Sequence, residues 1–142
     1  FPGTGFKCAG GISLRELLFC LNTIFQYSEH TIVDIVEFKL PDLDVKNAVV
    51  GRVNREAFCS KLSSYVAQTR VYATYFDDPN NRKWVKEKYG LDVYKPRRIL
   101  VVGRRSDFPL DEWREIVADH RDLEIMTFDD LIDGVVAQFY RK

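Results

Sequence analysis

The sequence lacks the features that mark a membrane protein, a disulfide-rich secreted domain or a strongly basic chain. Its three cysteines are an odd number without CxxC spacing, which favours free thiols in a reducing compartment. No apolar run reaches the roughly 20 residues that a membrane-spanning helix needs. Twenty-one basic residues balance 21 acidic ones, so the overall charge indicates no polyanionic partner. These absences predict a cytoplasmic protein without a membrane partner.

Histidine is also scarce, since the chain contains only His30 and His120. His30 falls in a predicted turn and His120 near a predicted helix end, and both positions suit solvent-exposed side chains rather than catalysts. The sequence has no P-loop, no Gly-x-Gly-x-x-Gly element and no Ser-His-Asp ordering. Neither a nucleotide-binding loop nor a catalytic triad is therefore indicated.

The composition that remains is that of a globular domain. The 142 residues are 46% hydrophobic and 30% charged, which suffices for one core. No repeat, low-complexity stretch or linker divides the chain, so residues 1–142 are interpreted as a single domain. Because the first residue is Phe1 and not methionine, we expect this domain to be part of a longer protein.

Hydrophobic periodicity predicts an α/β fold, a mixed β-sheet flanked by helices. Apolar runs at residues 12–25 and 31–40, with a polar turn between them, predict an antiparallel hairpin. Residues 41–53 predict a loop, after which Asn54 would cap a helix over residues 55–76. The remaining predicted elements are a helix at 82–89 closed by Gly90, a buried strand at 98–103, a helix at 109–120, a strand at 123–127, and a helix at 128–140 capped by Thr127.

The segment Asp34-Ile-Val-Glu37-Phe-Lys39 places opposite charges at the end of a hydrophobic strand. Side chains alternate across a strand, so Glu37 and Lys39 share one face. A carboxylate can hold a magnesium-type ion that acidifies a bound water, and a lysine can orient or deprotonate that water or neutralise phosphorane charge. The pair therefore suits phosphodiester hydrolysis, and a simple same-face ion pair on a half-exposed sheet is the alternative.

Two further features could contribute to such a site. Gln68 lies beside the apolar stripe of the predicted helix and should face the sheet or its margin, unless it only bonds water at the helix flank. Basic residues also gather around the strand predicted at 98–103, where they could meet phosphates or simply form a solvated rim. These basic residues are Lys95, Arg97, Arg98, Arg104 and Arg105.

Four segments together resemble the nuclease domain of the Shedu anti-phage defence family. Glu37-Phe-Lys39-Leu-Pro41 is similar to the family's Glu-x-Lys-x-Pro, and Gln68-Thr-Arg-Val-Tyr72 is similar to its Gln-x-x-x-Tyr element in the next helix. Residues 96–104 resemble a family strand that ends in Gly-Arg, and residues 123–131 resemble the closing strand and helix. The resemblance spans about residues 32–131.

This resemblance implies a restriction-endonuclease-like fold of the PD-(D/E)xK kind. It also implies a DNA endonuclease that uses magnesium, or manganese in its place, and acts in bacterial defence against phage. Glu37 would be a metal ligand, Lys39 the catalytic lysine and Gln68 a supporting residue. Family members look like homo-oligomers, so self-association is expected as well.

The chain departs from the family pattern at the first acidic residue. Asp34 lies at an odd offset from Glu37, which places it on the opposite face unless a bulge intervenes. If the hairpin turns between residues 28 and 29, Glu16 shares the face of Glu37 and lies level with Lys39. Glu16 is therefore the predicted second metal ligand. If neither acid serves, the domain would bind nucleic acid or a partner without cutting, and an assembly domain whose chemistry lies upstream is a third alternative.

Overall fold

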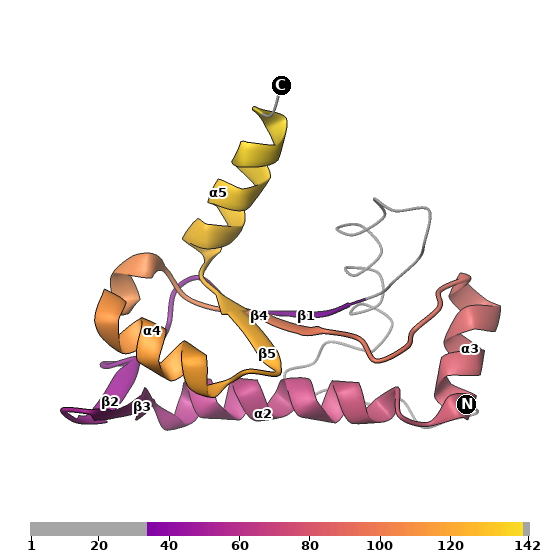
Figure 1. The fold of residues 1–142 in the computed structure, drawn as a ribbon, viewed down its shortest axis with the longest axis horizontal. Coiled ribbons are helices and arrows are strands. Elements are labelled where there is room, and N and C mark those ends of the chain that lie inside the picture. Colours follow the sequence, from indigo (N-terminus) through magenta and orange to yellow (C-terminus); the bar gives the residue numbers. More distant parts are fainter. Residues whose placement is uncertain (1–33, 141–142) are drawn as a thin grey trace.

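Three short parallel strands form the centre of the fold in a computed structural model that describes residues 34–140 (Figure 1). They are β1 (Ile35–Phe38), β4 (Arg98–Val101) and β5 (Leu123–Met126), in the spatial order β1-β4-β5. Each residue of β1 pairs with one of β4, from Ile35 with Arg98 to Phe38 with Val101. The carboxyl ends of the three strands therefore meet at one edge of the sheet.

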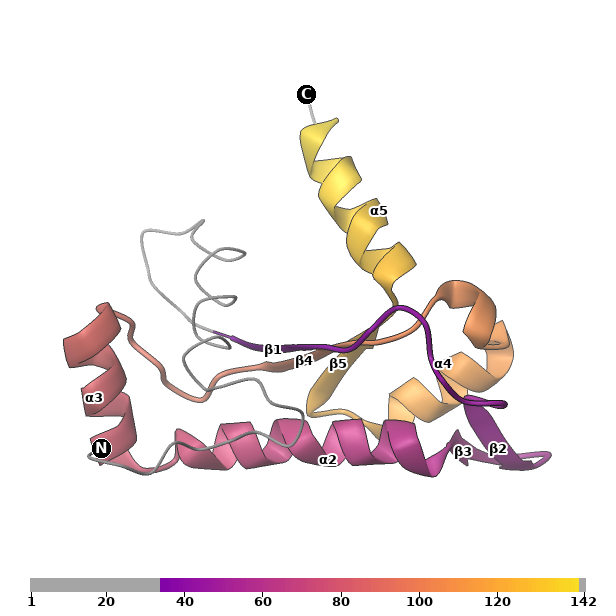
Figure 2. The same cartoon turned by 180° about the vertical axis from the view of Figure 1, so that it is seen from behind.

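A two-stranded hairpin and helices surround this sheet. The antiparallel hairpin consists of β2 (Val49–Arg52) and β3 (Arg55–Phe58). Helix α2 crosses one face of the sheet, whereas α5 rises from its other side (Figures 1 and 2). The helices are α2 (Ser60–Tyr75), α3 (Pro79–Tyr89), α4 (Leu110–Asp119) and α5 (Phe128–Phe139), and a 3-10 turn, η1 (Arg105–Asp107), precedes α4.

The core lies on both faces of β4, as its uninterrupted apolar sequence predicts. Leu100 and Val101 are 1% and 0% exposed, because a central parallel strand is covered on both sides. Leu100 belongs to a cluster with Leu62 of α2, and Val101 belongs to a second cluster with Tyr72 of the same helix. Helix α2 therefore contributes to both clusters, and its packing sets the position of its side chains against β1 and β4.

The helices predicted after residue 80 are confirmed, with ends that differ by a few residues. Gly90 ends α3 with a φ of 68°, a left-handed conformation that glycine adopts without strain. Thr127 caps α5 by accepting a hydrogen bond from the backbone N–H of Asp130 at 3.2 Å. The Asp130 carboxylate accepts one from the Thr127 hydroxyl at 2.8 Å. Burial alone would raise the pKa of Asp130, but the hydrogen bonds from Arg105 and Thr127 outweigh it and lower that pKa.

Two predictions between residues 41 and 60 are wrong. Val49–Arg52 form β2 within the predicted loop, and Arg55–Phe58 form β3 where a first helical turn was expected. Asn54 is not a helix cap, because it lies in the hairpin turn with a φ of 63°, which asparagine tolerates. Phe58 fits the helical spacing of the apolar residues that follow it, yet it is a buried residue of strand β3. Hydrophobic periodicity alone therefore could not distinguish a helix from a strand at this position.

The predicted sheet is confirmed only in its coarser features. The described residues form a mixed α/β structure in which the three-stranded sheet is wholly parallel and the antiparallel pair is separate. The strand expected at 31–40 is present as β1, whereas the strand expected at 12–25, which carries Glu16, lies outside the described residues. Among residues 34–140, no helix is long and apolar enough to span a bilayer.

The capping box of α5 makes a stability prediction. Thr127→Ala removes a buried hydroxyl that caps the helix, so we expect the free energy of unfolding to fall by about 1 kcal/mol. Thr127→Ser keeps the oxygen and should retain most of that stability. Urea unfolding followed by circular dichroism would measure both variants, and an equal loss in the two would show that the hydroxyl is not the stabilising group.

Candidate active site

Lys39 lies just beyond β1, where three groups surround its ammonium. Its Nζ is 2.6 Å from Oε1 of Glu37 and donates a hydrogen bond to Oε1 of Gln68 at 2.7 Å. The same Nζ lies 4.6 Å from the centroid of the Tyr65 ring. A carboxylate, an amide oxygen and an aromatic face all attract a cation, so the ammonium is stabilised in one position.

The local sequence accounts for this arrangement. The backbone N–H of Lys39 still bonds the carbonyl of Val101, at 3.0 Å, so the alternation of β1 continues through Lys39 and leaves its side chain on the face of Glu37. On α2, Tyr65 and Gln68 are three residues apart and therefore neighbours on the helix surface. The Gln68 amide also donates to the hydroxyl of buried Tyr72 at 2.7 Å, so both ends of this amide are engaged.

These residues line a pocket of about 780 Å³. One wall is the end of β1, another is the loop of residues 40–44, and the third is a stripe along α2. The stripe consists of Lys61, Tyr65, Gln68 and Tyr72, whose spacing of three and four residues places them on one helix face. Such a volume falls within the range of small-molecule sites, so a nucleotide-sized group could enter beside Glu37 and Lys39.

The acidic residues of this pocket differ in burial. Glu37 is 4% exposed, whereas Asp42 and Asp44 are exposed and Asp42 is paired with Arg104 at 2.8 Å. Within residues 34–140, no cluster of three or more histidine, cysteine, aspartate or glutamate side chains is placed to hold a metal ion. Magnesium commonly uses one or two carboxylates together with waters and substrate phosphates. Glu37 fits one such ligand, and the predicted second ligand, Glu16, lies outside the described residues.

Asp34 is engaged at the opposite end of β1. Its Oδ2 accepts a hydrogen bond from Nη2 of Arg97 at 2.6 Å, and its Oδ1 accepts one from the Arg97 backbone N–H at 3.2 Å. This hydrogen bonding, together with the charge of Asp34, raises the pKa of Arg97. Asp34 is therefore part of a structural ion pair at the amino end of the strand, and it does not line the pocket around Lys39.

The predicted basic cluster is divided between the two edges of the sheet. Arg97 and Arg98 lie at the amino end of β4, and Arg98 donates to the Thr69 hydroxyl at 3.2 Å. Arg104 and Arg105 follow the carboxyl end of β4, on the side of the pocket. Arg105 pairs with two carboxylates of α5 at 2.8 Å each, which raise its pKa. All four arginines have internal partners, and their role as DNA contacts stays a prediction.

Sequence reasoning missed Tyr65 and Lys61 as pocket residues. Tyr65 fits the three- and four-residue spacing of the apolar residues of α2, and its half-buried ring does contact the core. The signal that could have found it is its position three residues before Gln68, which makes the two side chains neighbours. Lys61 falls within the first turn of α2, four residues before Tyr65, so the same helical spacing could have placed it on this face.

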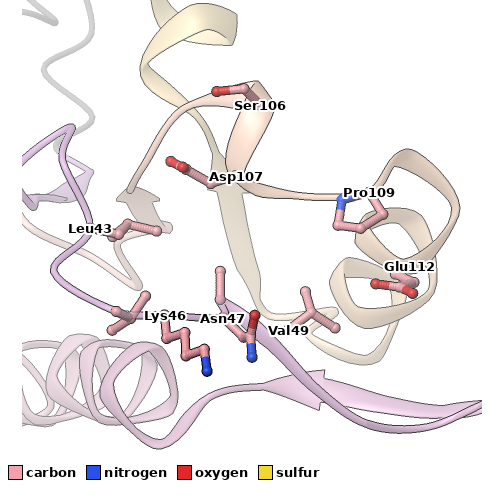
Figure 3. Close-up of a pocket in the computed structure, with 10 residues that line it drawn as sticks. Leu43, Lys46, Asn47, Val49, Ser106, Asp107, Pro109 and Glu112 are labelled. Atoms are coloured by element: carbon pink, nitrogen blue, oxygen red, sulfur yellow. The ribbon is translucent and has the colours of Figure 1, made fainter.

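A smaller pocket of about 330 Å³ lies between residues 43–49 and the start of α4 (Figure 3). It shares only Leu43 with the larger pocket. Asp107 in its wall accepts a hydrogen bond from the backbone N–H of Arg104 at 2.7 Å, which stabilises the η1 turn. The Asp107 carboxylate therefore stabilises a turn. The smaller pocket also has no ion pair like that of Glu37 and Lys39 among the described residues.

The chain matches no protein-family model and no curated protein. The Shedu resemblance therefore rests on the residues quoted above, and the activity that it implies stays a prediction.

The three partners of Lys39 make a spectroscopic prediction. Because they restrict its contact with water, we expect the Lys39 ammonium to exchange its protons slowly and to give a sharp ¹H–¹⁵N signal. Lys83, whose side chain is 74% exposed, provides the internal reference for fast exchange. Gln68→Leu removes one acceptor and should broaden the Lys39 signal, whereas a native Lys39 that exchanges as fast as Lys83 would contradict the geometry.

Proposed function

We propose that this domain is a metal-dependent endonuclease that hydrolyses phosphodiester bonds in DNA. The observation that carries the proposal is the ion pair between buried Glu37 and half-buried Lys39, whose charged atoms are 2.6 Å apart at the margin of a pocket of about 780 Å³. Lys39 also donates a hydrogen bond to Gln68. An ion pair that only stabilised the sheet would not need an adjoining pocket that admits a nucleotide-sized group. The role in bacterial defence against phage is proposed on the Shedu resemblance.

The same proposal extends to the fold family, the binding partner, the metal, the oligomeric state and the location of the protein. The mixed α/β structure would be a restriction-endonuclease-like fold of the PD-(D/E)xK kind. The partner would be DNA, the metal magnesium or manganese, and the protein a homo-oligomer of the cytoplasm. The resemblance supports the fold, the DNA partner, the metal and the self-association, and the odd number of cysteines without CxxC spacing supports the cytoplasmic location.

The chemistry assigns different tasks to the two charged groups. Magnesium, when bound, would stabilise charge on the phosphate and acidify a water molecule. Glu37 supplies a hard oxygen ligand of the kind that this ion prefers. Lys39 donates hydrogen bonds from a fixed position and can neutralise charge that develops on a phosphate oxygen. Gln68 and Tyr65 orient Lys39, which limits the conformational freedom lost when substrate binds.

A binding module that does not cut nucleic acid is the second candidate. It is favoured by one observation, that Glu37 is the only buried carboxylate lining the pocket within residues 34–140. A single carboxylate holds a divalent ion weakly unless substrate phosphates or a further acid complete the ligand set. The two candidates differ in a measurable way, because only the nuclease changes the covalent structure of DNA.

The nuclease proposal is tested by plasmid and linear-DNA cleavage in magnesium, manganese or EDTA. Glu37→Gln and Lys39→Met should each reduce the cleavage rate by about 100-fold or more, because they remove a metal ligand and a charge-stabilising group. EDTA should abolish cleavage by the native protein.

A matched control lies on α3, where Lys83 and Glu87 form another Glu–Lys pair at 3.8 Å, largely exposed. Glu87→Gln and Lys83→Met make the same chemical changes and should leave cleavage unaltered. Full cleavage by Lys39→Met would contradict the proposed role of Lys39. Folded native protein that binds DNA without cutting it in either metal would favour the binding module.

The identity of the second carboxylate is tested with two further variants. Glu16→Gln should reduce metal-dependent cleavage strongly, because Glu16 is the predicted second ligand. Asp34→Asn should leave cleavage unchanged but lower the free energy of unfolding by about 2 kcal/mol, since it weakens charged hydrogen bonds to Arg97. Denaturant unfolding and cleavage assays on both variants would measure these effects, and the reverse pattern would assign the ligand role to Asp34.

A further inference from the structure

The β2–β3 hairpin carries two arginines on one exposed face. Arg52 and Arg55 are directly opposite in the antiparallel register, on either side of the two-residue turn formed by residues 53 and 54. Residues opposite each other in such a pair point to the same side of the hairpin. The hairpin lies at one end of α2 and extends away from the three-stranded sheet (Figures 1 and 2).

This arrangement places like charges together without compensation. Two cations directly opposite on one face destabilise a hairpin, and neither arginine forms an ion pair within residues 34–140. The two strands nevertheless approach each other closely next to the turn. Gly51 has a φ of 116°, and a Cβ at this position would lie 2.3 Å from the carbonyl oxygen of Arg55. The sequence thus uses a glycine to close a hairpin whose tip concentrates positive charge.

Further cations continue from the hairpin toward the pocket. Residues 45–61 contain four basic residues, the two arginines with Lys46 and Lys61, against one acid, Glu56. The Glu56 carboxylate accepts a hydrogen bond from the backbone N–H of Asn54 at 2.9 Å within the turn. Lys61 follows β3 in the first turn of α2, lines the pocket, and bonds only the carbonyl of Asp44, at 3.4 Å, among the described residues.

Three arginines around β4, in contrast to those of the hairpin, are paired with carboxylates. Arg97, Arg104 and Arg105 are each bound to a carboxylate at 2.6 to 2.8 Å. A phosphate would have to displace those partners, whereas it would relieve repulsion between Arg52 and Arg55. The more favourable site for a polyanion is therefore the hairpin.

We infer that the β2–β3 hairpin is the element that docks duplex DNA. Arg52 and Arg55 bind backbone phosphates, and Lys61 binds a phosphate between the hairpin and the pocket that holds Lys39. A two-stranded ribbon is narrow enough to lie along a groove of the duplex, with its side chains directed to the phosphates. The inference rests on the proposed function for its substrate, and it assigns binding to residues outside the catalytic pair.

The test measures binding of the full chain to a labelled DNA duplex in EDTA, by fluorescence anisotropy over a range of salt concentrations. Loss of two phosphate contacts in the double variant Arg52→Ala/Arg55→Ala should reduce the slope of log affinity against log salt by about 2. Arg52→Lys/Arg55→Lys preserves both charges and should keep the native slope. This lysine variant also replaces both side chains, so a native slope would show that substitution at these positions does not by itself unfold the hairpin.

A control with equal charge change is available on α3, at the other end of α2 (Figure 1). Lys83→Ala/Lys86→Ala removes two cations that pair with Glu87 and Asp92, and it should leave the slope unchanged. The inference is overturned if the alanine hairpin variant matches this control, or if native affinity does not depend on salt. It is also overturned if light scattering shows that the hairpin variant loses self-association while DNA affinity is retained. Because no metal is present, these outcomes are independent of whether the domain cleaves DNA.

Discussion

Burying a carboxylate beside an ammonium is costly, and this constraint organises the structure around Lys39. Neither Glu37 nor Lys39 can be removed from water unless each finds partners for its charge. Glu37 provides one partner of Lys39, and Gln68 and Tyr65 of α2 provide the others. The packing of α2 against β1 and β4 therefore does more than cover apolar surface, because it also completes the surroundings of this ion pair.

A second buried carboxylate, Asp34, lies immediately before β1 and has a different role from Glu37. Asp34 binds Arg97 through side-chain and backbone hydrogen bonds at the amino end of the strand, away from the pocket lining. That pair ties the start of β1 to β4. Glu37 and Lys39 lie at the carboxyl end beside a pocket of about 780 Å³, where their charges can meet a ligand. The two pairs lie at opposite ends of β1, and only the Glu37–Lys39 pair lines a pocket that could admit a ligand.

The neutral overall charge conceals an uneven distribution. The arginines that follow β4 neutralise carboxylates of α5 and of the loop after β1, so they contribute to internal structure. Residues 45–61 keep most of their positive charge uncompensated within the described structure. Electrostatic attraction of a polyanion depends on such local excess, since screening limits the reach of charge to about 10 Å at moderate ionic strength.

Local interactions were predictable from the sequence alone. The apolar run of β4, the glycine that ends α3 and the threonine that caps α5 are each specified within a few residues, and the structure has all three. Alternation along β1 likewise predicted that Glu37 and Lys39 share a face, and the position of Gln68 beside the buried stripe predicted that it faces the sheet or its margin. Both features depend only on the geometry of one strand or one helix.

Contacts between distant segments were decided by the tertiary structure. Phe58 fits both a helical stripe and a strand, and only its pairing with Val49 selects the strand. Tyr65 becomes a partner of Lys39 because α2 crosses β1, and Arg97 becomes a partner of Asp34 because β1 and β4 are parallel. The sequence determined which residues could form each local element. Packing between the elements decided which charged side chains form ion pairs and which have no such partner among the described residues. Coulomb energy depends on the distance between two charges in space, and the separation of two residues along the chain does not give that distance.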